Sequence, residues 1–177
     1  MPYERDPVTQ ARKWAIPGTQ GLEHRIGGLE KAHNTGTISY DPENHQTMTN
    51  ERHAKIANIA NDIPLVEIAG NKLAKTIVVS WGGTYGSVST AVEECNKGGM
   101  ELGHVHLQYM NPLPRNLGEI LRKAERIIVP ELNMGQLKML LGGTFGVPIQ
   151  SISQVRGKPF KISYLTAEFH RILETQK

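Results

Sequence analysis

The feature that most constrains the fold is a regular alternation of short apolar runs with helical patterns between residues 76 and 174. A continuous apolar run is typical of a strand that is buried on both faces of a parallel sheet. Strands that alternate with helices of this length form β-α units with right-handed crossovers. The sequence therefore predicts an α/β fold with three layers, a mainly parallel sheet with helices on both faces, and strands over 76–81, 102–109, 126–130 and, nearer an edge, 149–155.

Helix signals follow each predicted strand. The first helix carries an apolar stripe that includes Val88 and Cys95 and stops at Gly98. Pro114 stands near the start of the second, and Asn133 is a natural cap for the third. Thr166 is expected to cap the last helix.

The first 70 residues differ in character, because they are crowded with Gly, Pro, Asn, His and charged residues. We expect a loop-rich connector over 1–70 and the α/β domain over 71–177. Within the connector, Thr49 is expected to cap a helix over 49–60 with Ile56 and Ile59 facing inward, and 64–69 can add an edge strand. A segment of this kind has little core of its own and must cover another surface.

Composition narrows the classes of protein. Hydrophobic residues make up 38% and charged residues 21%, in the range of globular proteins, and no run approaches the roughly 20 apolar residues that cross a bilayer. Cys95 is the single cysteine, which excludes an internal disulfide and a cluster held by four thiolates of this chain, so the cytoplasm is the expected location. The net charge of +3 is scattered, which disfavours nucleic acid as a partner.

The turn after the first predicted strand is one candidate site. Such a junction exposes backbone N–H groups at the positive end of a helix, where phosphate or carboxylate can bind, or it serves only to bring the helix against the sheet. It matches neither the dinucleotide fingerprint nor the P-loop. The candidate residues are Gly82, Gly83, Thr84, Tyr85, Gly86 and Ser87.

Polar residues at the corresponding end of the third strand form a second candidate. Glu131, Asn133 and Gln136 can hold a ligand or cap the helix and fix an interface, and we favour the structural role. His104 and His106 share one face of a strand, but without a third ligand nearby we expect a polar interface there rather than a metal site. Neither Ser80 nor Ser87 has an evident base, so no catalytic residue and no metal ligand is assigned to this chain.

Several segments taken in order resemble the α subunit of 2-oxoacid:ferredoxin oxidoreductases, and most closely its 2-oxoglutarate branch. The segments are 15–19, 21–31, 39–45, 48–49, 52–55, 80–87, 111–114 and 130–137. The resemblance covers nearly the whole chain. It implies that residues 71–177 form a domain similar to the C-terminal domain of transketolase.

The resemblance also implies a reaction and a set of partners. The family decarboxylates a 2-oxoacid oxidatively on thiamine diphosphate, with coenzyme A as acyl acceptor and ferredoxin as electron acceptor. Thiamine diphosphate, Mg²⁺ and an iron–sulfur cluster are expected elsewhere in the complex, since the chain has no Gly-Asp-Gly signature and one cysteine. The expected partners are the β subunit and the N-terminal domain of the α subunit, and a homodimer is possible. The chain alone should have no turnover.

By the same resemblance, His24, Arg25 and His45 can approach the anionic substrate or coenzyme A in the full complex. Two other interpretations stay open. One is an independent α/β module that binds a nucleotide or phosphorylated ligand at the loop of Gly82 to Ser87. The other is the matching domain of a related thiamine enzyme, against which the motifs over 17–55 argue.

Overall fold

The computed structural model describes residues 1–174, which form two compact units. Unit 1 contains Met1–Ile63 and Asn111–Leu113. Unit 2 contains Pro64–Met110 and the residues from Pro114 onward. Each unit is described by itself.

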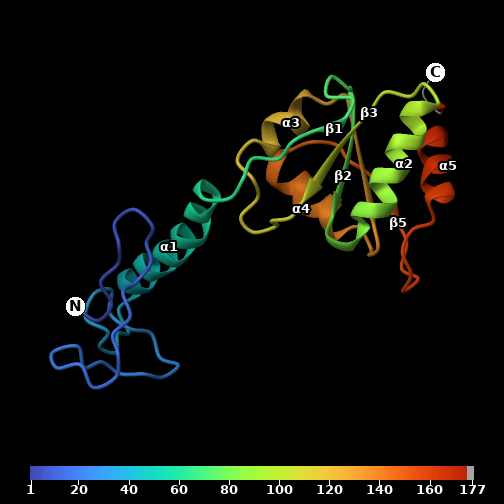
Figure 1. Ribbon diagram of the computed structural model, residues 1–177. Coiled ribbons are helices and arrows are strands. Elements are labelled where there is room, and N and C mark those ends of the chain that lie inside the picture. The colour runs from blue at the N-terminus through green and yellow to red at the C-terminus, as the bar shows by residue number, and fades with distance from the viewer. Residues whose placement is uncertain (175–177) are drawn as a thin grey trace. The chain divides into compact units, whose positions relative to one another are not determined.

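A five-stranded sheet forms the centre of unit 2, in the order β1-β3-β2-β4-β5 (Figure 1). All neighbouring strands are parallel except the edge strand β1, which pairs antiparallel with β3. The central strand is the predicted apolar run, and five of its six residues are buried. The strands are β1 (Ala69–Gly70), β2 (Thr76–Trp81), β3 (Leu102–Leu107), β4 (Arg126–Glu131) and β5 (Gln150–Ser153).

Helices cover both faces of this sheet, as Figure 1 shows. One face carries α2 (Tyr85–Lys97) and α5 (Ile162–Glu174), and the other carries α3 (Leu117–Lys123) and α4 (Gln136–Phe145). A short 3₁₀ turn, η2 (Gly82–Thr84), connects β2 to α2. The predicted three-layer α/β fold is therefore confirmed.

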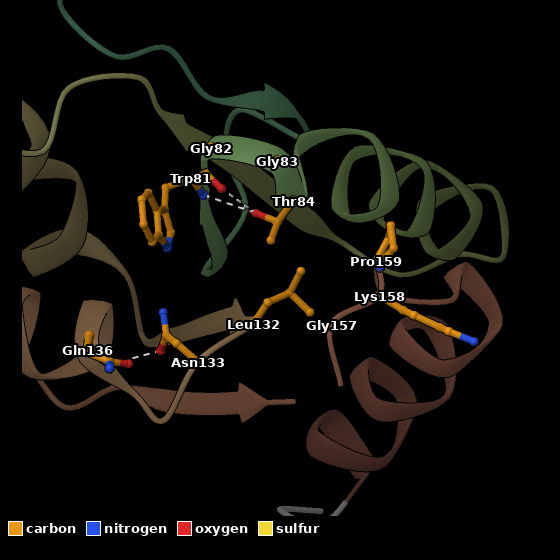
Figure 2. Close-up of a pocket in the computed structure, with 10 residues that line it drawn as sticks. All are labelled: Trp81, Gly82, Gly83, Thr84, Leu132, Asn133, Gln136, Gly157, Lys158 and Pro159. Carbon is orange, nitrogen blue, oxygen red and sulfur yellow. Dashed lines mark hydrogen bonds between the residues drawn. The ribbon is translucent and has the colours of Figure 1, made fainter. Parts of the chain in front are cut away.

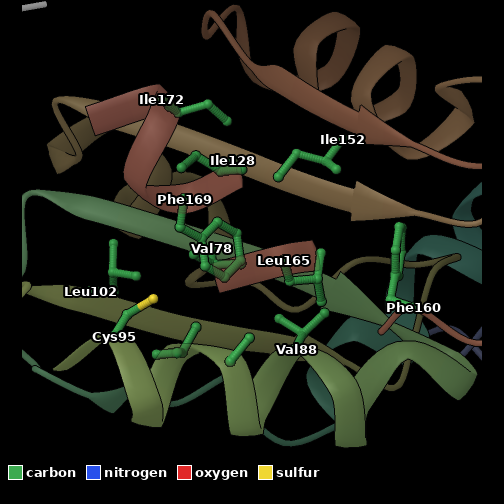
Figure 3. Packing of buried hydrophobic residues seen from close by; sticks show 12 residues of the cluster. Val78, Val88, Cys95, Leu102, Ile128, Ile152, Phe160, Leu165, Phe169 and Ile172 are labelled. Atoms are coloured by element: carbon green, nitrogen blue, oxygen red, sulfur yellow. The ribbon is translucent and has the colours of Figure 1, made fainter. Parts of the chain in front are cut away.

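The larger core lies between the sheet and the α2–α5 pair (Figure 3). Phe169 and Leu165 of α5 are fully buried there against Val78 of β2 and Val88 of α2. Cys95 of the apolar stripe is 2% exposed, and burial raises the pKa of its thiol, so the thiol is buried and inert.

Two details of unit 2 differ from the prediction. The last helix begins at Ile162, so Thr166 lies inside it, where its hydroxyl donates to the Ser163 carbonyl (3.0 Å) and does not cap. The edge strand expected over 64–69 is reduced to Ala69–Gly70. The Asn116 side chain donates to the Val66 carbonyl (2.8 Å) and accepts from the Val66 N–H (3.0 Å). The backbone of Val66 therefore bonds to a side chain instead of to a neighbouring strand.

Unit 1 is loop-rich and contains one long helix, α1 (Pro42–Asn58), followed by η1 (Ile59–Asn61). The helix begins seven residues before the predicted Thr49 because Asp41 accepts from the Glu43 N–H (3.2 Å) and Pro42 fits the first turn. The expected inward face is also wrong, since Ile56 and Ile59 are 37% and 40% exposed.

The core of unit 1 is small. Met48 is its one buried hydrophobic side chain among residues 1–63 and 111–113, all of which the structure describes. Ion pairs organise part of the rest: Glu51 accepts from Arg5 Nε (2.9 Å) and pairs with His33 (2.7 Å). The expectation of a segment with little core of its own agrees with this packing.

Among residues 1–174, no helix combines the length and the apolar character that crossing a bilayer requires.

Candidate functional site

The sheet topology places a crevice at the carboxyl ends of β2 and β4. The chain leaves β2 through α2 toward β3 on one side, and it leaves β4 through α4 toward β5 on the other side. Because the two connections diverge, the edge of the sheet opens between the two strands. In open α/β sheets, ligands bind at this kind of topological switch point.

A cavity of about 750 Å³ lies at this position, within the range typical of small-molecule sites (Figure 2). Three loops form it: the turn after β2, the turn after β4, and the loop between β5 and α5. Its lining residues are Trp81, Gly82, Gly83, Thr84, Leu132, Asn133, Gln136, Gly157, Lys158 and Pro159.

The residues of the predicted loop after β2 belong to two different elements, η2 and α2. Gly82, Gly83 and Thr84 line the cavity. Thr84 is buried and fixes the turn, since its hydroxyl donates to the Trp81 carbonyl (2.7 Å) and accepts from the Trp81 N–H (3.3 Å). Gly82 has a φ of +54°, a backbone conformation that favours glycine.

The remaining residues of that loop are in α2. The Ser87 hydroxyl donates to the Phe160 carbonyl (3.0 Å), which ties α2 to the loop before α5. Tyr85 packs against two histidines of β3. Gly86 has open space where a Cβ would be.

The turn after β4 depends on one buried carboxylate. Glu131 is 0% exposed, and its oxygens accept from the Leu137 N–H (2.8 Å), the Lys138 N–H (3.3 Å) and the Ser151 hydroxyl (3.0 Å). Glu131 thereby satisfies backbone donors at the start of α4. Its oxygens are held inside the fold rather than offered to the cavity.

Two amide side chains complete the same turn. Asn133 Oδ1 accepts from the Gly135 N–H (2.9 Å) and the Gln136 N–H (3.1 Å), and Gln136 Oε1 accepts from the Met134 N–H (2.9 Å). These contacts are structural ones within the turn, but the N-cap of α4 is Gly135, so the prediction that Asn133 is the cap is wrong. They leave the amide nitrogens of Asn133 and Gln136 without an assigned role.

A polar cluster that the sequence did not predict lies inside the sheet. The Ser80 hydroxyl lies 2.7 Å from His104 Nε2 and 2.8 Å from His106 Nδ1. Tyr85 stacks on His104 and meets His106 edge-on. The histidines do share a face, but His104 is 3% exposed and lies within the fold rather than at a polar interface.

The prediction that Ser80 has no base nearby is therefore wrong, because two imidazoles lie within hydrogen-bond distance of its hydroxyl. Its complete burial still keeps it from acting as a nucleophile. This contact follows from the pairing of β2 with β3, which sets Ser80 opposite His106. Desolvation, with a smaller contribution from His106, lowers the pKa of His104 to about 4, and desolvation lowers the pKa of His106.

These shifts predict that unit 2 loses stability as the pH falls. The unfolded chain binds a proton at His104 below about pH 6.5, whereas the folded chain resists protonation down to about pH 4. As the pH falls from 7.5 to 5, we expect the free energy of unfolding to decrease by about 2 kcal/mol because of His104, measured by urea denaturation. His104→Asn should flatten this dependence, and the control His170→Asn, at an exposed position, should not. Equal slopes in wild type and His104→Asn would contradict the assignment.

Two of the candidates of unit 1, His24 and His45, have different partners. His24 contacts the Leu22 carbonyl and the Tyr3 ring, and it lines a cavity of about 380 Å³ together with Arg12. His45 pairs with Glu30, which also accepts from Arg52 (3.2 Å). Within residues 1–174, no hydrogen bond or ion pair links the side chains of His24, Arg25 and His45. Their approach to a substrate or to coenzyme A stays a prediction.

Metal ligands are not gathered in this part of the protein. Residues 1–174 contain no group of three or more His, Cys, Asp or Glu side chains that could hold a metal ion.

Comparison with known proteins identifies the relatives of this chain. The model of pyruvate:ferredoxin oxidoreductase core domain II matches residues 74–164. Subunit KorA of the 2-oxoglutarate oxidoreductase of Mycobacterium tuberculosis is 44% identical over 98% of the chain. A 2-oxoglutarate synthase subunit KorA of Methanocaldococcus jannaschii is 30% identical over 59% of the chain.

One solved structure has the same fold. The 2-oxoglutarate:ferredoxin oxidoreductase of Magnetococcus marinus superposes on 96% of this chain with a TM-score of 0.85 at 24% identity, and it was solved with 2-oxoglutarate, coenzyme A and succinyl-CoA bound. The chain spans 26% of the mycobacterial relative, 30% of the archaeal one and 30% of the solved chain.

These matches confirm the resemblance seen in the sequence motifs. The core domain II model alone covers half of the chain, and the similarity to KorA extends through the loop-rich unit as well. The chain belongs to the α-subunit family of the 2-oxoacid:ferredoxin oxidoreductases.

Proposed function

We propose that this chain is a part of the α subunit of a 2-oxoglutarate:ferredoxin oxidoreductase, an enzyme that forms succinyl-CoA, CO₂ and reduced ferredoxin. The observation that carries the proposal is the 44% identity to a 2-oxoglutarate oxidoreductase subunit over 98% of this chain. The role of the chain in that enzyme is assembly, and it has no turnover alone.

The chemistry of the side chains supports a non-catalytic role. Ser80, the one hydroxyl placed between two imidazoles in the described residues, is fully buried. Cys95 is buried with a raised pKa. Neither side chain can therefore meet a substrate.

The described residues of this chain offer no ligand set for two of the cofactors of the proposed reaction, the iron–sulfur cluster and Mg²⁺. One cysteine cannot hold an iron–sulfur cluster, and the described residues offer no group of ligands for Mg²⁺. We assign thiamine diphosphate, Mg²⁺ and the cluster to other parts of the complex.

The surface of unit 1 supports partner binding. Trp14 is 94% exposed, Tyr40 84% and Ile26 79%, while the unit buries one hydrophobic side chain. Large exposed aromatic and aliphatic side chains on a segment without its own core mark a protein interface. The partners that we propose are the β subunit and the N-terminal domain of the α subunit.

Co-purification tests this proposal. We expect the tagged chain to retain the β subunit and the N-terminal α domain when all three are co-expressed. Trp14→Ala should weaken retention about thirtyfold, since a truncated aromatic anchor costs about 2 kcal/mol. Leu73→Ala, an equally exposed apolar residue of unit 2, is the matched control and should leave retention unchanged. Failure of the wild-type chain to retain either partner would contradict an assembly role.

A further inference from the structure

The cavity at the switch point contains hydrogen-bond donors that no residue uses. In Figure 2 the indole N–H of Trp81 and the side-chain amide nitrogen of Asn133 point toward one another from opposite walls of the cavity. Within residues 1–174, neither nitrogen donates to another group. Trp81 is 37% exposed, so the cavity is open to a ligand.

The side-chain oxygen acceptors around the same cavity already accept hydrogen bonds from backbone N–H groups. Asn133 Oδ1 and Gln136 Oε1 accept from N–H groups of their own turn. The Glu131 carboxylate behind them is buried and bound by Leu137 and Lys138. The polar side-chain groups that remain for a ligand are therefore donors, which favours a ligand rich in acceptors.

The rest of the lining is largely apolar. The Trp81 ring, Leu132 and Pro159 offer a surface for a carbon skeleton. Lys158 lies on the rim, and Figure 2 shows its side chain directed away from Trp81 and Asn133. Its charge can raise the local concentration of an anion without contacting the bound group in this arrangement.

We propose that this cavity binds a small organic anion. Its carboxylate or phosphate accepts hydrogen bonds from Trp81 Nε1 and Asn133 Nδ2, and its apolar part packs on the Trp81 ring and Leu132. The proposal depends on unit 2 alone and is independent of the role in assembly. Loss of ligand binding and loss of partner retention are therefore separate results.

Tryptophan fluorescence provides the measurement. The chain has two tryptophans, and Trp14 is 94% exposed in unit 1, so Trp14→Phe leaves Trp81 as the sole reporter. The Trp14→Phe chain is titrated with AMP, inorganic phosphate, succinate and 2-oxoglutarate, each up to about 10 mM. We expect a saturable change for AMP or for one of the dicarboxylates. Comparison of these arms identifies phosphate or carboxylate as the bound group.

A matched pair of variants locates the binding. Asn133→Asp keeps the oxygen that caps the turn but replaces the donor with a negative charge, so anion affinity should fall at least about tenfold. Asn71→Asp makes the same change at the amino end of the sheet, where the Asn71 oxygen likewise accepts from a backbone N–H (Leu73, 2.9 Å). It should stay within about twofold of the parent.

Three results would overturn the proposal. The first is no saturable response to any of the four probes, and the second is an equal loss of affinity in the Asn133→Asp and Asn71→Asp variants. The third is a response to inorganic phosphate alone that Asn133→Asp leaves unchanged. A fall confined to Asn133→Asp, with an unchanged urea midpoint, would support it.

Discussion

Glu131→Ala is expected to destabilise unit 2 by about 3 kcal/mol, because it removes at once the acceptor of the buried Leu137 N–H, of the partly buried Lys138 N–H and of the Ser151 hydroxyl. The carboxylate is 0% exposed, so water cannot replace it without opening the turn. Urea unfolding followed by Trp81 fluorescence in the Trp14→Phe background reports on unit 2 specifically.

Two companion variants separate the hydrogen bonds from the charge. Glu131→Gln keeps one carbonyl acceptor for the Leu137 N–H and should cost about 1 kcal/mol. Glu119→Ala removes an exposed carboxylate whose ion pair with Lys123 lies on the surface, and it should cost less than about 1 kcal/mol. If Glu131→Ala were no more destabilising than Glu119→Ala, Glu131 would not hold the start of α4.

Gly103→Val is expected to be similarly damaging, at about 3 kcal/mol. Gly103 lies in β3, where a Cβ would come within 2.8 Å of Ile68 Cγ2 and Ile77 Cδ1, and 3.1 Å of the Asn71 carbonyl oxygen. The two methyl groups can shift, but the backbone oxygen cannot easily do so, and overpacking of a filled core costs 1–3 kcal/mol or more. The loss is measured by the same urea unfolding.

A size series and a control make this test sharp. Gly103→Ala should cost less than Gly103→Val, since it adds one carbon instead of three. Gly143→Ala lies in α4, where an added Cβ meets nothing within 4 Å, and it should stabilise unit 2 by about 0.5–1 kcal/mol. Equal stability of the Gly103→Val variant and the wild type would show that the contact between β3 and its neighbours is looser than described.

The fold of unit 2 was predictable because its local signals agree with its tertiary packing. The run over 76–81 is apolar because both faces of β2 are covered, and the helix stripe that includes Val88 and Cys95 is the face that packs in the larger core. The same reasoning failed at Thr166, a competent cap residue that lies within a helix beginning four residues earlier, at Ile162.

The site was only partly predictable, because it depends on strand neighbours. The sequence singled out Gly82, Gly83, Thr84, Asn133 and Gln136, all of which line one cavity. It could not join them, since the adjacency of β2 and β4 follows from the connection that leaves β3 and crosses past β2. The contact of Ser80 with two histidines was missed for the same reason, as it requires the register of β2 against β3.

Unit 1 was the least predictable part. Helix α1 has few apolar residues to bury, so an amphipathic stripe was a poor guide to its faces. Its first turn was instead determined by Asp41 and Pro42, a local capping signal that outweighed Thr49.

The central claim is that this chain supplies a scaffold to an enzyme whose chemistry resides in other polypeptide segments. The most direct measurement is 2-oxoglutarate- and CoA-dependent reduction of ferredoxin, or of a viologen dye, by the purified chain with thiamine diphosphate and Mg²⁺ added. We expect no reduction above the protein-free rate, and activity only when the β subunit and the rest of the α subunit are present. Sustained turnover by the chain alone would contradict the claim.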